Sequence, residues 1–175
     1  MADRFETLIS AEQIAARVTE LGAELDAIYG DEPVLALGVL KGSILFMSDL
    51  IRAMQGDVRC AFLGVSSYHG TNSTGEVRIT HDLTASIEGK HVLVVEDIVD
   101  TGLTLSYLRN LLEMRKPKTL RIVTLLDKPS RRTTEVRVEH VGFSIPDAFV
   151  IGYGLDLDQR YRNLPYIGIY SEESD

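Results

Sequence analysis

Cysteine is almost absent from this chain: one residue, Cys60, stands among 175, and tryptophan is missing altogether. A lone cysteine excludes an internal disulfide and is typical of proteins from a reducing compartment, so we expect a cytoplasmic protein. Because most residues around Cys60 are apolar, we expect it to lie in the core, where free cysteine is most often found.

Long apolar runs and an excess of basic residues are also lacking. No run approaches the roughly 18 apolar residues of a membrane helix, and the N-terminal residues MADRFETLIS contain no stretch of signal-peptide type. The formal net charge of −8 disfavours nonspecific binding to nucleic acid, which depends on neutralising phosphates with Lys and Arg. We therefore expect neither a membrane nor a nucleic-acid partner, whereas a small phosphorylated ligand stays open.

The middle of the chain alternates between apolar and amphipathic segments. Strands are predicted at residues 34–40, 58–68, 91–95 and 119–126, and helices at residues 11–29, 44–54 and 101–114. Strands and helices that alternate in this way are typical of an α/β fold with a Rossmann-like, doubly wound parallel sheet. The length suits a single core, so we expect one domain over residues 1–175.

Three parts are expected within this domain. The sheet and its helices form the core, about residues 34–130. Residues 67–89 are polar and rich in Gly, Ser and Thr, which predicts a flexible arm or β-ribbon that serves as a lid. The N-terminal helix and the short β pieces of the C-terminal part, about residues 1–30 and 135–175, are predicted to pack as a small hood over one end of the sheet.

The most informative stretch reads HVLVVEDIVDTGLTLSYL and spans residues 91–108. Its apolar start ends in Glu96, Asp97 and Asp100, after the predicted strand and before the predicted helix. Ligands of open α/β sheets bind at the carboxyl ends of strands. Residues 100–104 offer free backbone N–H groups, two hydroxyls and a helix dipole, which together predict an anion site. Two carboxylates directly before it suit vicinal hydroxyls, so a ribose 5-phosphate would satisfy both.

This stretch resembles the 5-phosphoribosyl-1-pyrophosphate (PRPP) binding motif of the type I phosphoribosyltransferases. Further matches spread over most of the chain, and they resemble the hypoxanthine-guanine phosphoribosyltransferases of purine salvage. The resemblance implies the type I phosphoribosyltransferase fold. It also implies transfer of the 5-phosphoribosyl group from PRPP to N9 of hypoxanthine or guanine, which gives IMP or GMP and pyrophosphate.

The resemblance assigns the parts of PRPP to three groups of residues. Glu96 and Asp97 would meet the ribose hydroxyls. The turn for the 5-phosphate would consist of Asp100, Thr101, Gly102, Leu103 and Thr104, although Leu103 stands where several relatives have lysine. Pyrophosphate would be bound by Lys41, Gly42 and Arg162, and the family has a non-proline cis peptide in the loop of the first two.

For the purine, the resemblance implies a separate set of contacts. Lys128 would contact the 6-oxygen, Phe149 would stack on the ring, and the Val150 carbonyl would accept from the 2-position. Asp100 would be the catalytic residue, placed near N7 to manage the purine proton. An unpaired buried cation is costly, so Lys128 should reject adenine, whose 6-amino group is itself a donor.

A metal and a lid complete what the resemblance implies. Magnesium (Mg2+) would be the cofactor, with Glu96 and Asp97 near one ion and Asp156 near a second. Ser67 and Tyr68 would begin the closing lid. Relatives are oligomers, so a homodimer or homotetramer is expected.

Two other functions stay open at this point. One is a phosphoribosyltransferase that prefers xanthine or another base, because xanthine shares the 6-oxo group that Lys128 would recognise. The other is a PRPP-sensing regulator that keeps the fold and binds nucleic acid, which the net charge of −8 disfavours.

Overall fold

The computed structural model describes residues 5–68 and 76–171. Its elements are β1 (Phe5–Ile9), α1 (Ala11–Tyr29), β2 (Val34–Leu40), α2 (Ile44–Ala53), β3 (Val58–Tyr68), β4 (Glu76–His81), β5 (His91–Val99), α3 (Leu103–Glu113), β6 (Thr119–Asp127), the short 3-10 helix η1 (Pro129–Arg131), β7 (His140–Ser144), β8 (Val150–Ile151) and β9 (Ile167–Tyr170). None of the helices in these two ranges is long and apolar enough to span a membrane.

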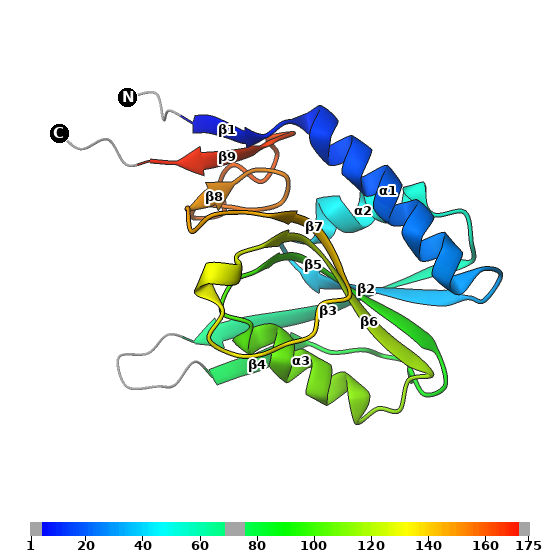
Figure 1. Cartoon of the computed structure of the whole chain (residues 1–175). Coiled ribbons are helices and arrows are strands. Elements are labelled where there is room, and N and C mark those ends of the chain that lie inside the picture. Colours follow the sequence, from blue (N-terminus) through cyan, green and yellow to red (C-terminus); the bar gives the residue numbers. More distant parts are fainter. Residues whose placement is uncertain (1–4, 69–75, 172–175) are drawn as a thin grey trace.

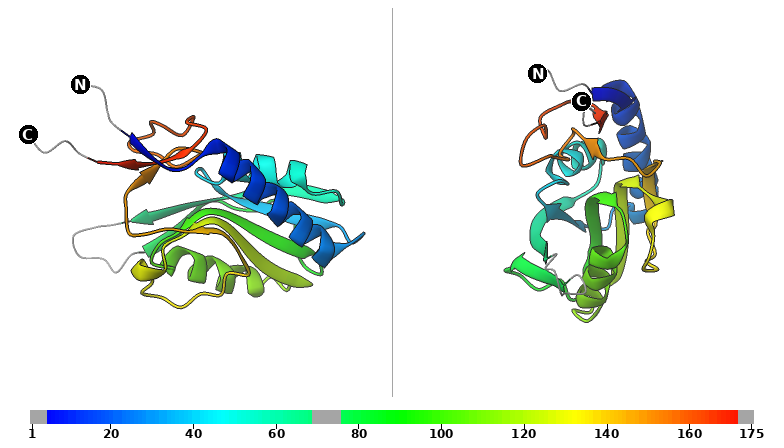
Figure 2. Two further views of the ribbon diagram at one scale, coloured as in Figure 1. Left: turned by 45° about the horizontal axis from the view of Figure 1, so that its top comes forward. Right: turned by 90° about the vertical axis from the view of Figure 1, so that its left-hand side faces the viewer.

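A six-stranded sheet with the order β4-β3-β2-β5-β6-β7 forms the centre of the molecule (Figure 1). Five of its strands are parallel, and β4 is antiparallel to β3. Helices α1 and α2 cover one face and α3 covers the other, each over its own hydrophobic cluster (Figure 2). The prediction of an α/β fold with a doubly wound parallel sheet is confirmed.

Helix α1 begins where its sequence predicts. Ser10 Oγ accepts a hydrogen bond from the Gln13 backbone N–H (3.2 Å), and Gln13 Oε1 accepts one from the Ser10 N–H (2.8 Å). This capping box satisfies two N–H groups that a helix start otherwise leaves without partners. The apolar positions that follow at helical spacing, including Val18 and Leu25, are buried against the sheet.

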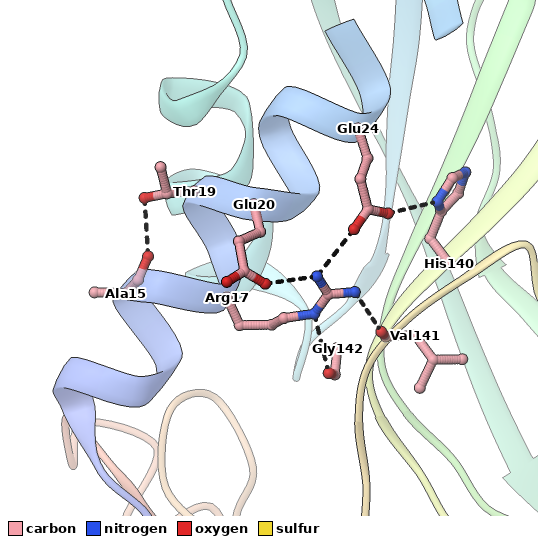
Figure 3. Close-up of polar contacts among 8 residues, drawn as sticks. All are labelled: Ala15, Arg17, Thr19, Glu20, Glu24, His140, Val141 and Gly142. Carbon is pink, nitrogen blue, oxygen red and sulfur yellow. Dashed lines mark hydrogen bonds and ion pairs between the residues drawn. The ribbon is translucent and has the colours of Figure 1, made fainter. Parts of the chain in front are cut away.

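Arg17 of α1 fastens the helix to β7, the edge strand of the sheet (Figure 3). Its guanidinium donates to the carbonyl oxygens of Val141 (3.0 Å) and Gly142 (3.2 Å). Glu24 accepts from Arg17 (2.9 Å) and lies 3.3 Å from His140 Nδ1. Partial burial by itself raises the pKa of Glu24, but these two contacts outweigh it and hold the pKa below its ordinary value. Carbonyls at a sheet edge that would otherwise be open are thus bound by a side chain.

Two differences from the expected layout concern the hood. Helix α1 lies beside α2 on a face of the sheet, and β7 joins the sheet itself as a parallel neighbour of β6. The smaller, separate sheet has the order β1-β9-β8, and its strand β1 was not predicted. Residues 140–144 therefore belong to the core, because their backbone completes the hydrogen-bonding edge of β6.

Strand β5 is longer than predicted, and this changes the place of the acidic residues. Its pairing with β2 ends at Val95, but its pairing with β6 continues to Val99. Glu96 and Asp97 therefore lie inside the strand, not after it, and α3 begins only at Leu103. Beyond Val95 one side of β5 has no neighbouring strand among the described residues, which leaves that side to the loop after β2.

Two further expectations concern β3 and the lid. Cys60 is exposed, so its placement in the core was wrong. It lies beside Ala36 on the face that α1 and α2 cover, but that cover does not extend to β3 at Cys60 or Phe62. The β-ribbon interpretation of the polar arm is confirmed where β4 pairs with β3; residues 69–75 lie outside the described residues.

Candidate active site

A cavity of about 170 Å³ opens between the end of β5 and the start of α3. Residues 96–102, Thr104 and Leu105 line it. Gly102 caps the helix with a φ of 86°, and a Cβ there would lie 2.5 Å from the Thr134 carbonyl oxygen, so this turn requires glycine. The first turn of a helix presents N–H groups without helical partners. The cavity is therefore suited to an anion.

Two adjacent carboxyl groups, those of Glu96 and Asp97, line this cavity. Burial raises the pKa of both, and the negative charge of Asp97 raises that of Glu96 further. Asp97 Oδ1 accepts a hydrogen bond from the Ile98 N–H (2.8 Å), whereas Glu96 Oε2 is buried with no partner among the described residues. A buried acceptor in this state favours a bound hydroxyl or cation.

The loop after β2 packs directly against this carboxyl pair. The Leu40–Lys41 peptide is cis, as the resemblance implied. A Cβ on Gly42 would lie 1.5 Å from Asp97 Oδ2, and a Cβ on Gly154 would lie 2.0 Å from the Gly42 carbonyl oxygen. The Asp97 carboxylate, the loop at Gly42 and the segment at Gly154 thus meet at distances that only glycine allows.

Arg162 and Gln159 connect this loop to the C-terminal segment. Arg162 donates to the Gly154 carbonyl oxygen (2.7 Å) and forms an ion pair with Asp156 (2.9 Å). Gln159 Oε1 accepts from Arg162 Nη2 (3.1 Å) and from Lys41 Nζ (3.4 Å). The Gln159 N–H donates to Asp156 Oδ2 (2.8 Å). Both cations expected at the pyrophosphate therefore lie around one amide oxygen.

A second cavity, of about 310 Å³, adjoins the first. Its lining consists of Asp97, Ile98, Asp100, Lys128, Phe149, Val150, Leu155 and Asp156. Lys128 is buried, and its backbone N–H donates to the Val99 carbonyl oxygen (2.9 Å). The Phe149 ring is 52% exposed and has an edge contact with Tyr170. This cavity offers a flat apolar surface and a cation, which suits a planar ligand with a polar edge.

The comparisons with known proteins agree with this geometry. A sequence model of the phosphoribosyl transferase domain matches residues 6–158. The chain belongs to the phosphoribosyltransferase family. A curated hypoxanthine-guanine phosphoribosyltransferase from Bacillus subtilis is 54% identical over 165 residues, which are 94% of this chain and 92% of that protein. The family resemblance of the acidic stretch is confirmed.

Solved structures of this phosphoribosyltransferase family superpose closely. A hypoxanthine phosphoribosyltransferase from Staphylococcus aureus has a TM-score of 0.91 and 51% identity, covering 95% of this chain and 91% of that chain. A hypoxanthine-guanine phosphoribosyltransferase from Bacillus anthracis has a TM-score of 0.92 and 45% identity, covering 97% of this chain and all of that one (100%).

Most of the predicted site residues of this phosphoribosyltransferase meet around the two cavities. Leu103 is an exception: its side chain is 41% exposed and outside the cavity lining, and its N–H donates to Thr101 Oγ1 (3.3 Å). Ser67 and Tyr68 pair through their backbones with Val77 and Glu76 of β4.

Sequence reasoning missed three residues that contact predicted site residues of this phosphoribosyltransferase. Gln159 contacts Lys41 and Arg162, as described above. Arg131 Nε donates to Asp100 Oδ1 (3.0 Å), and Arg132, which also pairs with Asp127, donates to the Asp100 carbonyl oxygen (3.3 Å). The two arginines follow Lys128 closely, and this spacing is the one signal that could have drawn attention to them.

Proposed function

We propose that this phosphoribosyltransferase transfers the 5-phosphoribosyl group of PRPP to N9 of hypoxanthine or guanine and releases pyrophosphate. The observation that carries the proposal is the pair of adjoining cavities, which share Asp97, Ile98 and Asp100. One is suited to a phosphorylated sugar and the other to a planar base. The names of the relatives support the same activity.

The first cavity would bind ribose 5-phosphate. Its phosphate would accept hydrogen bonds from the turn of residues 100–104, where the N-terminus of α3 favours an anion. Backbone groups supply these contacts, so Leu103 in place of lysine is compatible with binding. The ribose hydroxyls would donate to Glu96 and Asp97, which gives the unpaired Glu96 oxygen a partner.

Pyrophosphate would lie beside the loop after β2. Lys41 and Arg162 would each exchange the Gln159 amide oxygen for a pyrophosphate oxygen. Gly42 would let the backbone approach the ligand, since glycine has no side chain and the Asp97 carboxylate already lies where a Cβ would stand.

Magnesium fits these residues as a shared ligand. No group of three or more His, Cys, Asp or Glu residues able to hold a metal occurs within residues 5–68 and 76–171, but Mg2+ usually takes one or two carboxylates together with phosphate oxygens and water. Glu96, Asp97 and Asp156 would supply those carboxylates, and Asp156 would share its ion pair with Arg162. Bound Mg2+ would neutralise charge on the pyrophosphate oxygens.

The second cavity would bind the purine and direct the reaction. Phe149 would stack on the ring, Lys128 would donate to the 6-oxygen and the Val150 carbonyl would accept from the 2-position. As the bond from C1′ to pyrophosphate breaks, N9 would attack C1′ and the Asp100 carboxylate would accept the proton that leaves N7. Acid–base help of this kind contributes about 10²–10⁴-fold. The lid that begins at Ser67 and Tyr68 would exclude water, which could otherwise attack C1′ in place of the purine.

A panel of bases tests the proposal. The protein is mixed with PRPP and Mg2+, and hypoxanthine, guanine, xanthine and adenine are offered separately while nucleotide formation is followed by ultraviolet absorbance. Magnesium-dependent formation of IMP and GMP with little AMP is the expected result. Faster use of xanthine would shift the assignment to that base. PRPP binding without activity on any base, together with salt-dependent binding of nucleic acid, would favour the regulator.

Self-association is the second part of the proposal. Ile44 and Leu45 of α2 and Phe62 of β3 are 46%, 36% and 37% exposed. Exposed apolar side chains of this size are compatible with contacts between subunits, where larger apolar patches occur. Light scattering should give a mass of two or four chains, and a monomer at micromolar concentration would contradict this part of the proposal alone.

A further inference from the structure

Asp100 is held from two directions by the segment that follows β6. Arg132 donates to its backbone carbonyl oxygen (3.3 Å), and Arg131 Nε donates to its carboxylate oxygen Oδ1 (3.0 Å). The proposed function gives Asp100 the purine proton. A residue that fixes the direction of this carboxylate therefore acts on the chemical step.

Arg131 reaches Asp100 from the same turn that carries Lys128. The Arg131 N–H donates to the Lys128 carbonyl oxygen (3.1 Å), and the Lys128 N–H donates to the Val99 carbonyl oxygen (2.9 Å). Helix η1 is thus tied both to the purine-facing lysine and to the end of β5. The spacing between Lys128 and Asp100 is set by backbone contacts, and Arg131 adds the orientation of one side chain.

A second carboxylate lies near the same guanidinium. Asp147 Oδ2 is 3.8 Å from Arg131 Nη1, which is longer than the contact with Asp100. Hydrogen bonding to Asp100, helped by the charges of Asp100 and Asp147, raises the pKa of Arg131 further above its ordinary value. Arg131 is therefore a permanent cation that favours Asp100 as its closer partner.

We propose that Arg131 is a positioning residue for the reaction: it anchors Oδ1 of Asp100 so that the rest of the carboxylate is directed to N7 of the bound purine. Asp100 lines both cavities, and the contact with Arg131 leaves Oδ2 outside it. Without the anchor the carboxylate turns freely about its side-chain bonds. The inference rests on the proposed function and adds a residue that the family resemblance did not assign.

An ordinary surface ion pair is the competing explanation, and it makes a different prediction. The side chains of Arg131 and Asp100 are 48% and 42% exposed, so their contact adds little to the stability of the fold. If the contact is only an exposed ion pair, its removal changes nothing measurable. If it orients Asp100, removal lowers turnover in a protein that melts at the wild-type temperature.

The experiment compares Arg131→Met, Arg131→Lys and Arg59→Met with wild type. Arg59 is a matched control, because it also pairs with an aspartate, Asp57, in an exposed position. It lies near the start of β3 and lines neither of the two cavities. For Arg131→Met we expect kcat to fall about 10- to 100-fold, the range that small misplacement of a reacting group produces. KM for PRPP and the melting temperature should stay within about twofold and a few degrees of wild type. Arg131→Lys should recover part of kcat, and Arg59→Met should leave it unchanged.

A combination with Asp100→Ala tests whether Arg131 acts through Asp100. Once the carboxylate is gone, Arg131→Met should lower kcat no further. An equal further loss overturns the inference, as does an Arg131→Met protein with wild-type kcat, or one in which KM for PRPP rises while kcat holds. If Asp100→Ala is too slow to measure, the single variants decide alone. A wild-type protein that forms no nucleotide overturns the proposed function and the inference together, whereas failure of the inference alone appears in an active wild type.

Discussion

Gly42 gives a direct test of the loop that faces the carboxyl pair. In a Gly42→Ala protein the new Cβ would lie 1.5 Å from Asp97 Oδ2 and 2.6 Å from Cγ, whereas ordinary contact begins at 3.4 Å. The two groups must separate by about 2 Å. The loop cannot retreat, because the Gly42 carbonyl oxygen is already packed against Gly154. Asp97 must therefore move, which breaks its hydrogen bond from the Ile98 N–H.

The expected loss follows from that displacement. A misplacement of 1 Å can cost about 10²-fold in rate, so kcat/KM for PRPP should fall at least about 100-fold. This corresponds to about 2.7 kcal/mol of transition-state stabilisation. The fold should survive, because the short Asp97 side chain can rotate away from the new Cβ. Overpacking typically costs about 1–3 kcal/mol of stability.

Steady-state kinetics with PRPP varied at saturating hypoxanthine, together with a thermal melt, measures both effects. Gly56→Ala is the matched control: a Cβ there meets only the Gly30 carbonyl oxygen, at 3.3 Å, and activity should stay within about twofold. A folded Gly42→Ala protein that retains more than about a third of wild-type kcat/KM would refute the reasoning, since it would mean that Asp97 can leave its place without consequence.

Three other substitutions give independent tests. Lys128→Ala should raise KM for hypoxanthine and guanine at least about 10-fold, because it removes the proposed donor to the 6-oxygen, while PRPP binding measured by calorimetry should hold; its collapse would refute the placement of Lys128. Glu139→Gln should lower the free energy of unfolding by about 2 kcal/mol, since Glu139 accepts from Arg109 (2.7 Å) in a buried position. Burial by itself raises the pKa of Glu139, but its favourable contacts, chiefly that with Arg109, outweigh burial and lower the pKa in the folded protein. The contribution of Glu139 to the free energy of unfolding is therefore complete above the ordinary glutamate pKa. It is lost as pH falls through the lower pKa that Glu139 has in the folded protein. The gap between the melting temperatures of wild type and variant should narrow as pH falls below the ordinary glutamate pKa, and a constant gap would contradict this. Ser10→Ala should cost about 1 kcal/mol in a urea titration by removing the cap of α1, and no change would mean that Gln13 caps the helix alone.

The parts of the fold that could be predicted are those encoded locally. Ser10 and Gln13 mark the start of α1, and the apolar run of residues 34–40 becomes β2 at the predicted bounds. The end of β5 could not be predicted in this way, because an apolar run marks only the part of a strand that is buried on both faces. Residues 96–99 continue the strand by pairing with β6 alone. The prediction that Cys60 is buried was wrong for a related reason, since its exposure depends on how far the helices extend over β3.

The same distinction between local and long-range contacts applies to the candidate site. Residues 96–104 could be recognised because their order along the chain matches the chemistry of one cavity. Arg131 is 31 positions from Asp100, and Gln159 is 118 positions from Lys41. Contacts over such separations depend on the whole topology, so only the three-dimensional structure reveals them. The cytoplasmic location and the roles of Ser67 and Tyr68 stay predictions.

The unpaired Glu96 oxygen links ligand binding to the stability of the folded protein. Among the described residues Glu96 Oε2 has no hydrogen-bond partner, and a hydroxyl of bound ribose would supply one. Ligands that bind only the folded form return stability, by about 2.7 kcal/mol at 100 times their Kd. PRPP would thus act as a chemical chaperone of its own enzyme, and cells with abundant PRPP would hold more folded, protease-resistant protein than starved ones.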